Sequence, residues 1–192
     1  MATPRILAFA GSLRRDSYNK KMVAVAAHGA RAAGAEVTIL DLASIPLPVF
    51  DEDLEARDGL PANGRKLKDL MIASQGLLIA SPEYNSSMSA ALKNVIDWAS
   101  RPAQGEAPLA AFANKVVGVM SASPGALGGL RGLVHVRAVL GNIQSIVLPD
   151  QFALTMAHEA FNPDGSMKDS KKQQTVEGIG RRVAEVAARL MG

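Results

Sequence analysis

The chain of 192 residues is 48% hydrophobic and 4% aromatic, with a formal net charge of +3. This length fits one domain and supplies enough apolar side chains for a full core, so we expect residues 1–192 to form a single domain. The sequence contains no cysteine, which excludes disulfides, thiolate metal sites and thiol redox chemistry, so any redox function would need a bound cofactor. The positive charge suits anionic ligands. Because aromatic residues are few and no basic stripe is interleaved with them, we expect no nucleic-acid binding.

The first apolar run, residues 6–10, is too short for a signal peptide or a membrane span. We therefore expect a cytoplasmic protein that does not enter a membrane. The three histidines, His28, His135 and His158, lie in separate segments without the spacing of metal ligands, so we expect no metal site.

Short apolar runs alternate along the chain with segments of helical periodicity. The runs that predict strands are residues 6–10, 37–40, 76–80, 116–120 and 145–148. The segments that predict helices are residues 22–33, 67–74, 92–99, 127–140 and 176–190. The last helix is expected to bury one face formed by Val176, Ile179, Val183, Val186 and Leu190.

Individual residues mark where some of these elements begin and end. Gly34 is placed to end the first helix, and Ser89 is placed to cap the third. Pro149 is expected to end the last strand. The acidic stretch 51–58 is expected to be an exposed loop.

Five strands alternating with five helices predict an α/β fold with a doubly wound parallel sheet and right-handed crossovers. For a sheet of this size the strand order 2-1-3-4-5 is one of the two common solutions. In that order the chain reverses direction between strands one and three, and ligands bind at the carboxyl ends of the strands beside such a point. The loops after strands one, three and four should meet there.

The loop after the first strand, residues 11–19, is rich in groups that bind phosphate. Ser12 and Ser17 supply hydroxyls, Asn19 an amide and Arg14 a guanidinium, next to the start of a helix. The loop has neither a Walker A motif nor a Gly-x-Gly-x-x-Gly fingerprint. It is expected to hold the phosphate of a cofactor; the alternative is an ordinary strand-to-helix turn with Ser17 as its N-cap.

The loop after the third strand, residues 81–89, combines a rigid proline, Pro82, with serines, an asparagine and free backbone amides that suit a planar heterocycle. Tyr84 adds an aromatic surface. A turn followed by a capped helix explains Pro82 and Ser89, but not the whole cluster.

The loop after the fourth strand, residues 121–129, is rich in serine and glycine, and its glycines would leave a low wall over a flat ligand. A hydrolase is excluded because the nucleophile elbow needs Gly-x-Ser-x-Gly and position 121 is serine. A tight turn without a ligand remains the alternative.

Together these loops resemble the motifs of the NADPH-dependent FMN reductase family, which has the flavodoxin-like fold and includes chromate, quinone and azo-dye reductases. The motifs that carry the resemblance are Gly11-Ser12-Leu13-Arg14 with Ser17 and Asn19, Pro82-Glu83-Tyr84-Asn85 followed by Leu92-Lys93-Asn94 and Ile96-Asp97-Trp98, and Gly128-Gly129-Leu130-Arg131. The chain departs from the family pattern at Ser86 and Ser89, where the family usually has glycine and proline.

The resemblance implies that the chain binds FMN and uses NADPH or NADH. It implies phosphate contacts from Ser12, Arg14, Ser17 and Asn19, contacts to the isoalloxazine edge from Pro82, Glu83, Tyr84 and Asn85, and a wall on the other side of the ring from Ser121, Ala122, Ser123 and Gly125. Hydride would pass from the nicotinamide to FMN, and electrons then to a quinone, chromate, azo or flavin acceptor, with no catalytic side chain.

The resemblance also implies a homodimer or homotetramer, for which residues 150–161 and the helix that contains Trp98 are candidate contacts. Two other functions are considered. A flavodoxin-like electron carrier would bind FMN without turning over a substrate of its own, and a regulatory or scaffold protein would bind no flavin.

Overall fold

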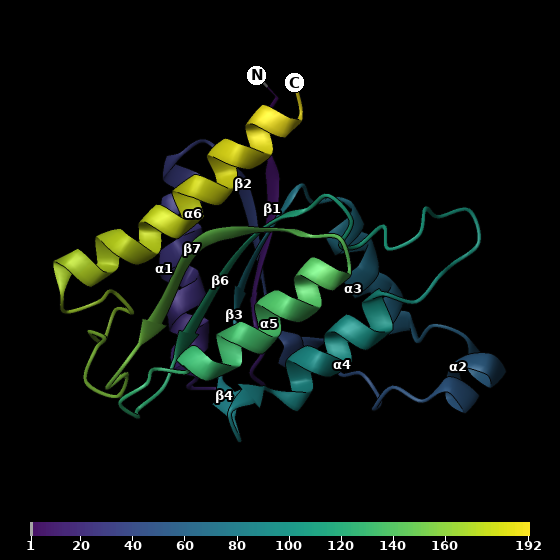
Figure 1. Ribbon diagram of the computed structural model, residues 1–192, viewed down its shortest axis with the longest axis horizontal. Helices are drawn as coiled ribbons and strands as arrows, with labels where there is room; N and C mark the ends of the chain where they lie inside the picture. The colour runs from purple at the N-terminus through teal and green to yellow at the C-terminus, as the bar shows by residue number, and fades with distance from the viewer. Residues whose placement is uncertain (1) are drawn as a thin grey trace.

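The central sheet of the computed structural model, which describes residues 2–192, contains five parallel strands (Figure 1). The strands are β1 Arg5–Ala10, β2 Glu36–Leu40, β3 Gly76–Ala80, β6 Val116–Ala122 and β7 Ile146–Leu154. They lie in the order β2-β1-β3-β6-β7. Counted within this sheet alone the order is 2-1-3-4-5, which confirms the predicted flavodoxin-like topology.

Helices cover both faces of the sheet. The helices α1 Tyr18–Ala32 and α6 Ser170–Leu190 pack on one face, and α3 Ala62–Ile72, α4 Ala90–Ala99 and α5 Leu130–Asn142 pack on the other. Successive residues of β1 alternate between the two cores: Ile6 and Ala8 face α1 and α6, whereas Leu7 and Phe9 face the opposite layer. Because the central strands are buried on both faces, they are continuous apolar runs, which is why they can be recognised in the sequence.

Helices α1 and α6 cross at two glycines. An ideal Cβ on Gly180 would lie 1.8 Å from the carbonyl oxygen of Ala26, and one on Gly29 would lie 2.0 Å from the carbonyl oxygen of Glu177. The two helix backbones therefore approach more closely than a side chain at either of these two positions would allow. Helix α6 also approaches the sheet closely, because an ideal Cβ on Gly76 of β3 would lie 2.8 Å from Cγ1 of Val183.

The buried face of α6 is only partly the one expected. Val176, Ile179 and Val183 are buried, but Val186 is partly exposed and Leu190 is 60% exposed. The remaining buried positions of the helix are Gly180, Ala184 and Ala187. Apolar periodicity missed them because small residues contribute little hydrophobicity, yet they are what lets α6 approach α1.

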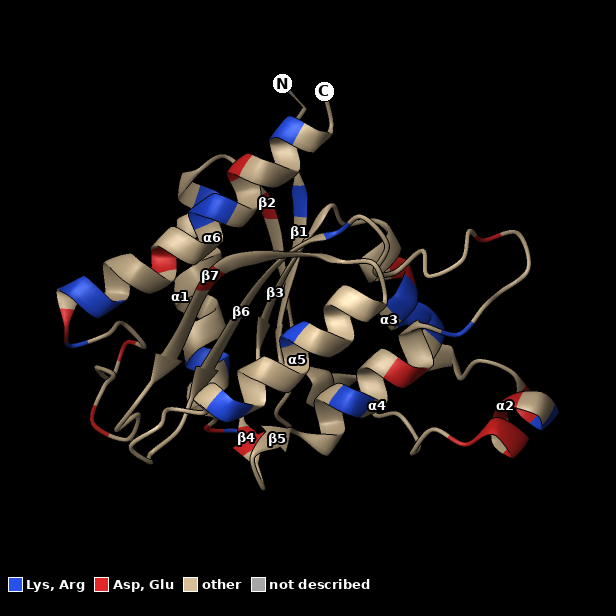
Figure 2. Cartoon of the chain, viewed as in Figure 1, with Lys and Arg blue, Asp and Glu red and all other residues tan. Residues whose placement is uncertain are grey.

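The acidic stretch expected to be a loop forms helix α2, Glu52–Asp58, so that expectation was wrong. The Asp51 carboxylate accepts hydrogen bonds from the N–H groups of Asp53 and Leu54, and acidic residues fill the first turn, where the helix dipole favours them. The helix is exposed, as expected, and Figure 2 shows its acidic residues in red on a helix that lies apart from the sheet. Gly59 ends it with a φ of +74°.

Strand β7 does not end at Pro149, as had been expected, but continues to Leu154. Its register against β6 shifts between Val117 and Val119, which pair with Val147 and Gln151. Pro149 falls in this bulge, on a strand at the edge of the sheet, where no ladder hydrogen bond is required of it. The bulge allows β7 to continue beyond Pro149.

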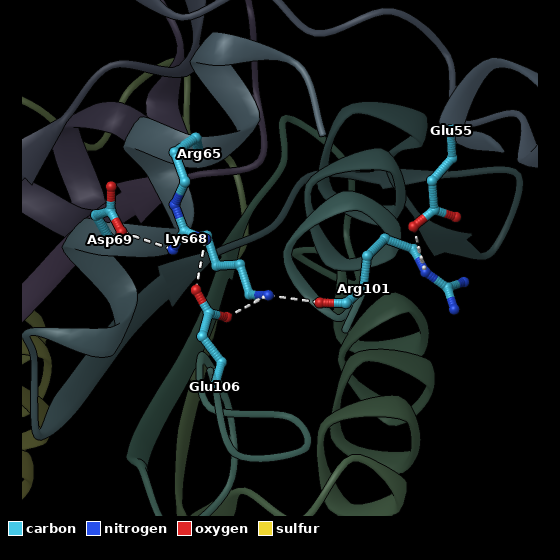
Figure 3. Close-up of polar contacts among 6 residues, drawn as sticks. All are labelled: Glu55, Arg65, Lys68, Asp69, Arg101 and Glu106. Carbon is cyan, nitrogen blue, oxygen red and sulfur yellow. Dashed lines mark hydrogen bonds and ion pairs between the residues drawn. The ribbon is translucent and has the colours of Figure 1, made fainter. Parts of the chain in front are cut away.

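The connection between α4 and β6 is fastened by ion pairs that the sequence did not signal (Figure 3). Lys68 of α3 is only 2% exposed, and its Nζ lies 2.6 Å from Oε2 of Glu106 and donates to the Arg101 carbonyl. Arg65, one turn earlier on α3, pairs with Glu106 and with Asp69. The hydrogen bond from Lys68 is the main cause that lowers the pKa of Glu106.

No helix in the part of the chain described is long and apolar enough to cross a membrane.

Candidate functional site

Three loops meet at the carboxyl edge of the sheet. The parallel register pairs Ala10 of β1 with Ala80 of β3, and Ala80 with Met120 of β6, so β1 and β3 end at the same level and β6 continues two residues further, to Ala122. The loops that follow them are residues 11–17, 81–89 and 123–129, which places the three predicted motifs beside the point where the strand order reverses.

The first loop presents free backbone donors around the start of α1. Among residues 2–192, the N–H groups from Ser12 to Asn19 make no hydrogen bond. Ser17 occupies the N-cap position, but its buried hydroxyl makes no capping hydrogen bond within the described chain. Ser17 thus stands at the N-cap position that an ordinary strand-to-helix turn would give it, and the free N–H groups of the loop suit the predicted anion.

The charged side chains of this loop differ in what they contact. The Arg14 guanidinium lies 5.5 Å from the centre of the Tyr18 ring, within the range of a cation–π contact. Arg15 and Asp16 form an exposed ion pair of 3.5 Å, with the Arg15 side chain 94% exposed. Arg14 is therefore the arginine held near the helix start, and Arg15 is solvated.

Asn19, in the first turn of α1, bonds to Ala122, the last residue of β6, and so links the ends of the first and third loops. Its Nδ2 donates to the Ala122 carbonyl at 2.9 Å, and the Ala122 N–H donates to its Oδ1 at 3.0 Å. The side chain is buried, so both hydrogen bonds are shielded from water. In this arrangement the Asn19 amide fixes the distance between two of the site's walls; its predicted contact with phosphate stays a prediction.

The second loop forms a short hairpin of β4, Glu83–Tyr84, and β5, Ser87–Met88. Its two turn residues, Asn85 and Ser86, have φ values of +50° and +66°. Positive φ at both central residues defines the type I′ turn that matches the twist of a hairpin. Tyr84 is 57% exposed at the tip and Pro82 is buried beneath it.

The strained residue of this turn is Ser86, where the family usually has glycine. We expect Ser86→Gly to raise the free energy of unfolding by about 0.5–1 kcal/mol, because glycine adopts a left-handed backbone without a Cβ clash. Chemical denaturation of both proteins measures the difference. A variant less stable than the parent would contradict the strain assigned to this position.

Ser89 ties the second loop to the first. Its Oγ accepts from the Leu92 N–H at 3.1 Å, which confirms the predicted helix cap, and donates to the Gly11 carbonyl at 2.5 Å. A Cβ on Gly11 would lie 2.7 Å from the Leu92 Cβ, so the loop rests directly on α4. The departure from the family's proline therefore adds a link between two loops.

The Glu83 carboxylate is directed at α5 and is 8% exposed. It accepts hydrogen bonds from the Arg131 guanidinium and from the Gly132 N–H. Burial alone would raise the pKa of Glu83, but the hydrogen bonds from Gly132 and Arg131 outweigh it and lower the pKa below its ordinary value. Any contact that Glu83 makes with a ligand must therefore come from its backbone.

The third loop folds tightly over the end of β6. Gly128 and Gly129 have φ values of +62° and +91°, which delays the start of α5 from the predicted residue 127 to Leu130. A Cβ on Gly129 would meet Oγ of Ser121 at 1.8 Å. That buried hydroxyl has no hydrogen-bond partner in the described chain.

The four predicted residues of this loop differ in exposure. Ser121 and Ala122 are buried at the strand end, Ser123 is half-buried and Gly125 is exposed. The Ser123 hydroxyl accepts from the Gly125 N–H at 3.2 Å. The outer half of the loop is therefore the part that a ligand can reach.

The strand order and the helices on both faces of the sheet define a protein of the flavodoxin-like class. The family model of NADPH-dependent FMN reductase matches residues 4–159, and the chain belongs to this family.

Curated relatives and solved structures agree with this assignment. The chain is 33% identical over 175 residues to an NAD(P)H-dependent FMN reductase of Pseudomonas aeruginosa, covering 90% of this chain and 89% of that protein. It is 35% identical over 145 residues to a quinone reductase of Escherichia coli K12, covering 75% of this chain and 73% of that protein. The flavoenzyme NAD(P)H:(acceptor) oxidoreductase FerB of Paracoccus denitrificans matches with a TM-score of 0.82 and 28% identity, covering 97% of this chain and 98% of that one.

Proposed function

We propose that the chain is an FMN-dependent NAD(P)H oxidoreductase that transfers electrons to small-molecule acceptors such as quinones, chromate, azo compounds or flavins. We further propose that residues 1–192 act as one FMN-binding domain in the cytoplasm. The observation that carries the proposal is the set of unpaired N–H groups from Ser12 to Asn19, at the switch point of a chain that belongs to the FMN reductase family.

The residues at the site fit FMN. The free amides of the first loop, with the Ser12 and Ser17 hydroxyls and Arg14, would hold the phosphate. The hairpin tip at Tyr84 and Asn85 would meet the edge of the ring, largely through backbone groups. The outer part of the third loop would line its other side.

Bound FMN would supply the redox chemistry, taking hydride from NAD(P)H and passing electrons to the acceptor. The protein's part is to bind and orient. The hydrogen bonds from Asn19 and Ser89 hold the three loops at fixed separations, so little reorganisation is needed on binding. No side chain at the site is assigned a proton transfer.

An enzyme is favoured over an electron carrier because both relatives are named as reductases, and the name of the Pseudomonas aeruginosa protein includes NAD(P)H. Carriers usually shield the ring with aromatic side chains, and the described loops offer only Tyr84 at the expected edge. Trp98 is fully buried, donating its indole N–H to the Pro48 carbonyl, and so does not reach the site. Sustained NADPH oxidation in the presence of a quinone would support the enzyme. FMN binding without such turnover would support the carrier, and no FMN binding would favour a scaffold protein.

Arg14 gives the sharpest test of the phosphate site. We expect Arg14→Ala to weaken FMN binding by about ten- to a hundred-fold, because a charged hydrogen bond contributes about 1.5–3 kcal/mol. Titration of the apoprotein with FMN, followed by flavin fluorescence, measures the change. Arg15→Ala is the matched control, since Arg15 is solvated and should leave the affinity within about twofold. Equal affinities for the parent and Arg14→Ala would remove Arg14 from the site.

We also propose that the chain forms a homodimer or homotetramer. Residues 150–161 remain candidate contacts, since Met156 is 47% exposed. In the helix that contains Trp98, the contact would have to come from exposed neighbours such as Lys93, because Trp98 itself is buried. Light scattering coupled to size-exclusion chromatography separates these states from a monomer.

A further inference from the structure

The hairpin of β4 and β5 rests on the first turn of α5 (Figure 1). Each of its strands has only two residues, so it is too short to be stable without support. Gly132 makes room for it: a Cβ there would lie 3.2 Å from the Ser87 carbonyl oxygen and 3.4 Å from the Glu83 Cβ. The position of the hairpin is therefore set by what it contacts on α5.

The strongest of those contacts is the Glu83 carboxylate. Its Oε1 accepts from Arg131 Nε at 2.9 Å and lies 2.7 Å from a terminal nitrogen of the same guanidinium. Its Oε2 accepts from the Gly132 N–H at 3.0 Å. Both partners belong to the first turn of α5, where N–H groups lack acceptors within the helix and the dipole favours a negative charge. The N-cap residue, Gly129, has no side chain with which to cap the helix, so Glu83 takes that part.

A second and weaker contact holds the other strand of the hairpin. Oγ of Ser87 lies 2.9 Å from Nδ1 of His135, one turn further along α5. Both strands are thus attached to the same helix, and the type I′ turn between them leaves the tip little freedom. The hairpin and the start of α5 form one unit whose anchor is Glu83.

We propose that Glu83 and Arg131 are positioning residues that hold the Tyr84–Asn85 tip against the isoalloxazine edge of bound FMN. The inference rests on the proposed function, and it separates two parts of the site. The first loop sets the affinity for the phosphate, whereas the Glu83–Arg131 pair sets the surroundings of the ring. The Glu83 carboxylate is buried against α5, so it would influence FMN only through the position of the hairpin.

The test compares Glu83→Gln, Arg131→Gln and Arg131→Lys with the parent and with Arg14→Ala. FMN affinity, the visible absorption spectrum and the midpoint potential of the bound flavin are measured for each. We expect Glu83→Gln and Arg131→Gln to weaken FMN binding about tenfold, because a hairpin tip that is no longer held must be ordered on binding, and to shift both the spectrum and the potential. Arg131→Lys keeps the charge and should restore part of the effect. Arg14→Ala should weaken binding without shifting the spectrum or the potential.

The double variant Glu83→Gln/Arg131→Gln checks that the two residues act as one pair, and it should bind FMN no more weakly than either single variant. If the parent binds no FMN, the proposed function fails. If the parent binds FMN but Glu83→Gln and Arg131→Gln keep its affinity, spectrum and potential, the positioning role is overturned even where the unfolding temperature falls. Should Glu83→Gln fail to fold, the two Arg131 variants decide the matter by the same readouts, because Arg131 is 58% exposed.

Discussion

Replacing Gly180 by alanine should lower the free energy of unfolding by about 3 kcal/mol, at the upper end of the usual overpacking range. The added Cβ would lie 1.8 Å from the Ala26 carbonyl oxygen and 3.0 Å from the Ala30 nitrogen. These are backbone atoms of α1, which cannot rotate away as a flexible side chain could. The helices must separate, and α6 must then lift from the sheet at Val183.

Gly178 provides the matched control, because it lies on the same helix and, apart from the surrounding backbone of α6 itself, no atom of the described chain lies within 4 Å of an added Cβ there. Gly178→Ala should raise the free energy of unfolding by about 0.5–1 kcal/mol, since alanine is the better helix former. Thermal unfolding of both variants is the measurement. In a chain of this length Gly180→Ala should lower the midpoint by about 6–12 °C, while Gly178→Ala should raise it. Midpoints that move together would show that the α1–α6 crossing is looser than its backbone contacts indicate.

The sequence predicted the sheet well because burial on both faces leaves a local signature. Residues 76–80 and 116–120 are apolar runs with polar or glycine-rich flanks, and both proved to be central strands. The expected strand order then predicted that three loops meet at the carboxyl edge of the sheet, beside the point where the order reverses. The alternation of strands and helices, which a single sequence displays, indicates the doubly wound fold, and this order is one of the two common ones for such a fold.

What escaped prediction depends on contacts that no local pattern encodes. Asn19 and Ala122 are 103 positions apart, so the amide suited to phosphate gave no sign that it would bond to the third loop. The same holds for Glu83, whose partner Arg131 lies 48 positions away. Helix α2 was missed because it buries no face, and its only signals are its Asp51 cap and an acidic first turn.

Asn19→Ala should both destabilise the protein and weaken its hold on FMN. The substitution removes two buried hydrogen bonds and leaves the N–H and carbonyl of Ala122 without partners. An unsatisfied buried group costs about 1–3 kcal/mol, so we expect the free energy of unfolding to fall by about 2–4 kcal/mol. Asn63→Ala is the control, because it removes a single surface bond to the Pro46 carbonyl and should change stability by about 1 kcal/mol or less.

The effect of Asn19→Ala on FMN follows from the same two hydrogen bonds. Without them the first and third loops are free to separate, so binding must also pay the entropy of bringing them together, and we expect at least about a tenfold loss of affinity. Asn19→Asp tests this account from the other side. Its carboxylate still accepts from the Ala122 N–H but cannot donate to the carbonyl, and it places a negative charge close to the predicted phosphate site at the start of α1. Its affinity for FMN should therefore fall further than that of Asn19→Ala. Denaturant titrations measure the free energy of unfolding of the parent and of Asn19→Ala. Equal values would show that other contacts hold the loops together, and would leave the phosphate as the remaining role for Asn19.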